Sequence, residues 1–63
     1  MISRKDRKEL ARIRDGIRQA HQELQSQAAK GLVDPQKVDR EMSARFGSDW
    51  RSTYHDADTL LQQ

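Results

Sequence analysis

The segment Gly31-Leu32-Val33-Asp34-Pro35 divides the chain into two helical halves and predicts a tight reversal between them. Gly31 can adopt the left-handed backbone conformation that commonly ends a helix. Asp34 is suited to cap the free amide groups of a following helix, and Pro35 fits the first helical position, where its missing N–H is not needed. We therefore expect a turn over residues 31–34 with a helix on either side.

The residues before this turn predict one long helix over about residues 4–30, which Ser3 can cap. Apolar residues recur three or four positions apart, as they do along a coiled-coil seam: Leu10, Ile13, Ile17, Ala20, Leu24 and Ala28. At a rise of 1.5 Å per residue this helix would be about 40 Å long, which is too long for a globule of this size. It is expected to form one arm of a hairpin.

The residues after the turn predict a return arm with a corner at Gly47. Helices are expected over about residues 35–46 and 49–61, because Gly47 can end the first and Ser48 or Asp49 can cap the second. Their apolar positions are in phase within each helix: Val38, Met42 and Phe46, then Trp50, Tyr54, Ala57 and Leu61. The predicted fold is therefore all-α, an antiparallel helical hairpin or three-helix arrangement forming a single domain over residues 1–63.

The composition predicts a thin core and association with another chain. Of the 63 residues, 33% are hydrophobic and 35% charged, and a domain this short buries only about 60% of the surface that its unfolded chain exposes. The sequence has no cysteine, so no disulfide can compensate for the small core. Self-association, a partner protein or both are therefore expected. The absence of cysteine and of any long apolar run predicts a cytoplasmic protein that makes no membrane contact.

Positive charge gathers on the first helix. Residues 1–18 hold seven basic and three acidic side chains, a net charge of +4, whereas residues 19–63 have a net charge of −2. At 100° per residue from Leu10, four arginines fall at about 40°, 60°, 80° and 120°, beside the apolar stripe. We call them the arginine flank: Arg14, Arg7, Arg18 and Arg4. It could form a solvated face, contact phosphates of a nucleic acid, or pair with an acidic partner helix or a second copy.

Trp50 is the largest side chain with a candidate role in binding. Its phase with Ala57 and Leu61 favours a core position over a platform for stacking nucleic-acid bases. In so small a core it is expected to lie near the surface, where it could anchor a partner protein.

The sequence contains no recognisable catalytic pattern. His21 lacks a second histidine four residues on, and His55, Asp56 and Asp58 do not converge on one side of a helix. The three glycines are too far apart for a phosphate-binding loop. We therefore expect no enzymatic activity and no metal or other cofactor. The leading interpretation is a small helical interaction protein that binds a partner protein, with a nucleic-acid-binding regulatory dimer as the alternative.

Overall fold

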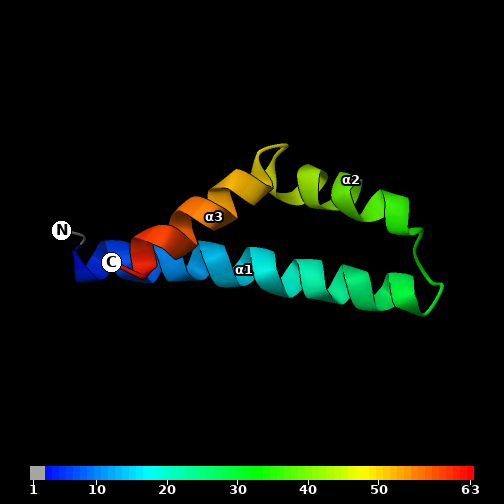
Figure 1. Ribbon diagram of the computed structural model, residues 1–63, viewed down its shortest axis with the longest axis horizontal. Coiled ribbons are helices and arrows are strands. Elements are labelled where there is room, and N and C mark those ends of the chain that lie inside the picture. The colour runs from blue at the N-terminus through cyan, green and yellow to red at the C-terminus, as the bar shows by residue number, and fades with distance from the viewer. Residues whose placement is uncertain (1–2) are drawn as a thin grey trace.

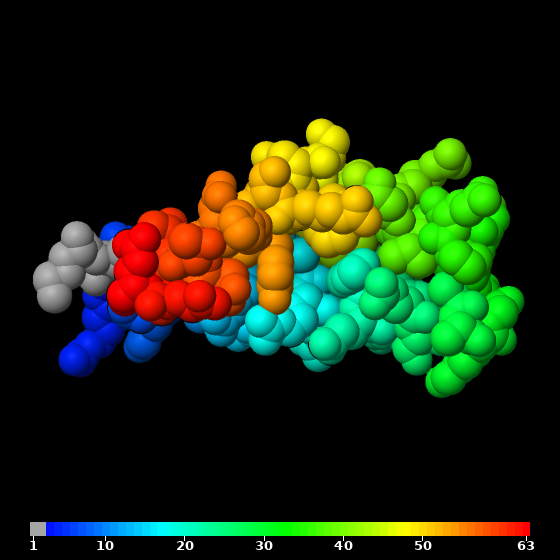
Figure 2. All heavy atoms as spheres, in the orientation of Figure 1, coloured from blue at the N-terminus to red at the C-terminus, as the bar shows by residue number. Residues whose placement is uncertain are grey.

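A long helix packs against two shorter ones in the computed structural model, which describes residues 3–63 (Figure 1). The elements are α1 (Arg4–Ala29), α2 (Pro35–Phe46) and α3 (Trp50–Leu61). Helices α2 and α3 return along α1, so the start of α1 and the end of α3 lie at the same end of an elongated molecule of 43 × 19 × 15 Å (Figure 1). Side chains fill the space between the ribbons (Figure 2). The predicted all-α three-helix arrangement is confirmed.

The turn between α1 and α2 forms as its residues predict. Gly31 has a φ of +78°, and its amide donates to the carbonyl of Ala28 at 3.1 Å. The Leu32 amide donates to the carbonyl of Gln27 at 2.9 Å, which completes a Schellman motif. On the other side, the Asp34 carboxylate accepts from the amide of Gln36 at 3.0 Å. Backbone groups at both helix ends are thus paired locally.

The corner between α2 and α3 forms at Gly47, also as predicted, but α3 begins one residue later than expected. Gly47 has φ +102° and ψ 160°, and its amide donates to the carbonyl of Ser43 at 2.8 Å. Neither predicted side-chain cap is found: Asp49 is the cap residue but makes no side-chain capping bond. The amide of Trp50 instead donates to the carbonyl of Gly47 at 3.2 Å.

The buried core lies between α1 and the return arm, around Met42, which has no exposed surface. Its members come from all three helices: Ile17, Ala20, Leu24, Val38, Met42, Trp50 and Ala57. The predicted apolar stripes extend beyond this core, since Ile13 and Phe46 are 41% and 38% exposed. Phe46 is the last residue of α2, at the corner where the return arm lies furthest from α1 (Figure 1).

No helix within residues 3–63 is long and apolar enough to cross a membrane.

Candidate functional site

Arg7, one of the four residues of the arginine flank, caps the end of α3. Its guanidinium donates hydrogen bonds to the carbonyl oxygens of Leu61 at 3.2 Å and Gln63 at 2.8 Å. The last carbonyls of a helix have no partner within it and carry partial negative charge, so a cation at this position is favourable. Arg7 therefore joins the first part of α1 to the end of α3.

Arg14 and Arg18 also contact α3. Arg14 lies 3.5 Å from the carboxylate of Asp58 and 3.1 Å from that of Asp15. Arg18 donates from Nε and Nη2 to the hydroxyl oxygen of Tyr54, at 3.0 and 2.7 Å, and its guanidinium carbon lies 5.6 Å from the centre of the Tyr54 ring. The hydrogen bond to Tyr54 raises the pKa of Arg18 above its ordinary value.

Three of the four arginines proposed from the sequence as binding residues thus form the seam between α1 and α3. Of the four, Arg4 alone has no side-chain hydrogen bond or ion pair with residues 3–63. Periodicity placed these arginines on one side of α1, but it does not indicate which neighbour lies against that side. Their partners on α3 lie four and three residues apart along one side of that helix: Tyr54, Asp58 and the carbonyl of Leu61. The sequence does not indicate that this side meets the arginines.

This geometry predicts that Arg7→Gln destabilises the protein although Arg7 is exposed. The substitution removes two charge-assisted hydrogen bonds to carbonyl oxygens, so we expect the free energy of unfolding to fall. The loss should be only about 0.5–1 kcal/mol, because solvent screens both hydrogen bonds. Arg4→Gln is the matched control, with an expected change of about zero. Urea unfolding followed by circular dichroism measures both. Equal values for the two variants would show that Arg7 does not hold the end of α3.

Trp50 lies in the core, as its phase with Ala57 and Leu61 predicts, and not near the surface, as the small size of the core suggested. Its role as an anchor for a partner stays a prediction. Only 5% of the residue is exposed. Its indole Nε1 donates to the carboxylate of Asp39 at 3.2 Å. The centres of the Trp50 and His21 rings lie 5.1 Å apart, and the two ring planes are tilted by 48°. The three helices meet around this ring, so it is covered more fully than a short sequence with few apolar residues suggests.

Arg51 covers the indole from outside. Its guanidinium carbon lies 4.7 Å from the centre of the Trp50 ring, and its Nη2 lies 3.4 Å from the same carboxylate oxygen of Asp39 that the indole contacts. The Arg51 side chain is nevertheless 70% exposed. Sequence reasoning overlooked Arg51, and the only available signal was its place next to Trp50.

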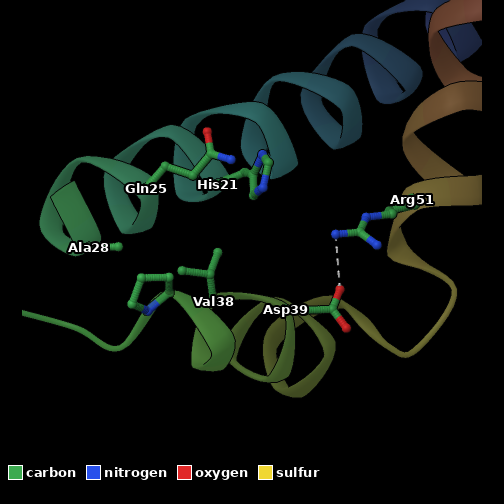
Figure 3. Close-up of a pocket in the computed structure, with 7 residues that line it drawn as sticks. His21, Gln25, Ala28, Val38, Asp39 and Arg51 are labelled. Carbon is green, nitrogen blue, oxygen red and sulfur yellow. Dashed lines mark ion pairs between the residues drawn. The ribbon is translucent and has the colours of Figure 1, made fainter.

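Two adjoining hollows lie beside Trp50, Asp39 and Arg51, and we call them together the central groove. The first, of about 350 Å³, lies between α1 and α2, with the Asp39–Arg51 ion pair at one end (Figure 3). The second, of about 290 Å³, continues between α1 and α3. His21 and Gln25 border both. The remaining lining residues are Ala28, Pro35, Val38, Asp39 and Arg51 in the first, and Ile17, Arg18, Gln22, Trp50 and Tyr54 in the second.

The central groove is suited to binding a group that accepts hydrogen bonds. Its floor includes apolar side chains, and donors border it: Arg18, His21, Gln22, Gln25 and Arg51. Its single carboxylate, Asp39, already accepts from Trp50 and pairs with Arg51. Within residues 3–63, no three His, Cys, Asp or Glu side chains are grouped so that they could hold a metal ion.

Comparison with known proteins finds no matching family model, no similar curated protein and no similar solved structure.

Proposed function

We propose that this chain is a non-catalytic interaction protein that binds an acidic segment of a partner protein in the central groove. The observation that supports this function is the exposed guanidinium of Arg51, which contacts Asp39 through Nη2 alone and keeps its other N–H groups free to donate. Arg51 is the strongest candidate contact, since most of its side chain is exposed although its stacking on Trp50 holds it in place. A guanidinium held in position loses little conformational freedom on binding a carboxylate.

The dimensions of the groove suit a peptide. Ligand pockets typically span about 300–1,000 Å³. The hollow of about 350 Å³ lies at the lower end of this range, and the hollow of about 290 Å³ lies just below it. Together they follow α1 over more than two helical turns, from Ile17 to Ala28. A short extended segment could place one apolar side chain over Val38 and a carboxylate near Arg51.

The same geometry favours a protein over a nucleic acid. Binding to a phosphate backbone needs several free cations in a row. Along the groove the only arginines are Arg18, which is engaged with Tyr54, and Arg51, and the net charge of the chain is only +2. The exposed cations on the first half of α1 lie outside the groove: Arg4, Lys5, Lys8 and Arg12. Recognition of a single acidic side chain needs only one or two donors.

We expect a short acetylated peptide of alternating Glu and Leu to bind the groove. Titration of the isotope-labelled protein should shift the NMR signals of His21, Gln25 and the Arg51 side chain. Arg51→Gln should weaken binding about five- to tenfold, because it removes one hydrogen bond to a charged group. Arg40→Gln, on the exposed face of α2, is the control and should leave affinity unchanged.

Two results would contradict this function. The first is an unchanged affinity in Arg51→Gln or signal shifts confined to other surfaces. The second is tighter binding of a DNA or RNA oligonucleotide than of the peptide, with an affinity that falls steeply as salt is raised. That outcome would favour the nucleic-acid interpretation. A peptide in which Gln replaces every Glu should bind more weakly than the acidic peptide.

A further inference from the structure

A second surface lies on the opposite side of α1 from the central groove. At 100° per residue from Leu10, Gln25 in the groove falls at about 60°, whereas Gly16 falls at about 240° and Ile13 at about 300°. We call this surface the open edge, and its members are all exposed: Lys5, Glu9, Ile13, Gly16 and Glu23. No residue of the open edge lines the groove, although Ile13 lies one turn from Ile17, which does.

No contact among the described residues requires a glycine at position 16. It lies in the middle of α1, where glycine stabilises a helix less than alanine does. No atom lies within 4 Å of the position that a Cβ would occupy. Glycine in a helix allows another backbone or side chain to approach closely. The space beside Gly16 is therefore available to a group from outside the chain.

Exposed apolar side chains lie on the side of this space towards the start of α1. Ile13 is 41% exposed and lies one turn from Gly16 on the same edge. Leu60, from α3, is 37% exposed, and it borders a hollow of about 320 Å³ with Asp6, Glu9 and Leu10. An exposed isoleucine side chain thus lies next to a position with no side chain. In a second copy of the same surface, the isoleucine of each copy can fill the space beside the glycine of the other.

The charges of the open edge are also self-complementary. Lys5 and Glu23 lie nine residues on either side of residue 14, and both fall at about 220° around α1. Neither forms an ion pair with any residue from 3 to 63. When two antiparallel copies of a helix cross near residue 14, Lys5 of one copy comes to lie beside Glu23 of the other. A two-fold axis then generates the reciprocal pair.

We propose that a second copy of this chain packs antiparallel on the open edge, with Ile13 of each copy against Gly16 of the other and Lys5 beside Glu23 of the second copy. The occupant is a second copy because a two-fold rotation brings the isoleucine of each copy to the glycine of the other and the lysine of each copy to the glutamate of the other. The packing would bury Ile13 and Leu60, which a 63-residue fold leaves exposed.

Charge reversal tests the proposed pairing. The dimer dissociation constant is measured by sedimentation of the full chain over a range of concentrations. Lys5→Glu alone and Glu23→Lys alone should each raise it about tenfold, because each replaces two attractive pairs by two repulsive ones. The double variant should return it close to the original value. A purely monomeric chain, or a double variant no better than the singles, would overturn the proposal.

A bulky residue at Gly16 provides a second, independent test. Gly16→Leu should abolish the dimer while leaving the helix content of the monomer unchanged, because the space beside Gly16 is empty within one chain. Gln36→Leu, on the exposed face of α2, is the matched control and should leave the dimer intact. A Gly16→Leu protein that remains dimeric would place the interface elsewhere. Peptide binding in the groove should persist in these variants, so failure here is distinguishable from failure of the proposed function.

Discussion

Replacing Trp50 by alanine is expected to remove a large share of the protein's stability. The indole is 5% exposed and packs against side chains of the core from α1 and α2. Removing a buried tryptophan side chain typically lowers the free energy of unfolding by about 3–5 kcal/mol, since apolar contacts are lost and a cavity remains. At about 0.05–0.15 kcal/mol per residue, a chain of this length has a total stability of only about 3–9 kcal/mol.

Trp50→Phe separates packing from hydrogen bonding at this position. Phenylalanine keeps much of the apolar area but has no donor for the Asp39 carboxylate, which remains paired with Arg51. We expect this variant to stay folded with a loss of about 1 kcal/mol. Circular dichroism and urea unfolding measure both variants. If Trp50→Ala retained native helix content and a cooperative transition close to that of the original chain, the indole would not be the centre of this core.

The substitution Gly47→Ala is expected to have the second largest effect, a loss of about 1–3 kcal/mol. Gly47 has φ +102° and ψ 160°, a combination that residues with a side chain rarely adopt. An added Cβ would also lie 3.0 Å from a carboxylate oxygen of Asp49. The corner would have to change its backbone angles, and α3 would lose its alignment with the core.

Gly31→Asn is the matched comparison for Gly47→Ala. Gly31 has a φ of +78°, and no atom lies within 4 Å of its Cβ position. Asparagine tolerates the left-handed conformation at a helix end better than most residues. We therefore expect thermal unfolding of Gly31→Asn to shift by less than that of Gly47→Ala. The reverse order would mean that the corner at Gly47 adapts more easily than the turn at Gly31.

The candidate site was predictable from the sequence only in part. Arginine periodicity correctly placed Arg7, Arg14 and Arg18 on one flank of α1, but these residues contact α3. The central groove depends on Asp39 and Arg51, which are twelve residues apart and belong to different helices. Neither has a sequence pattern that links it to the other, because the Gly47 corner alone brings them together.

The helices, the turn and the corner were determined by the sequence itself, because local chemistry decides them. Ser3, Gly31, Asp34 and Gly47 each act through backbone groups within a few residues, so their effects can be read without knowing the rest of the chain. Which side of α1 meets α3 was decided only by the tertiary structure. That choice depends on how Met42 and Trp50 fill the space beside α1. Their packing buries Trp50, directs three arginines onto α3 and leaves Ile13 and Gly16 exposed.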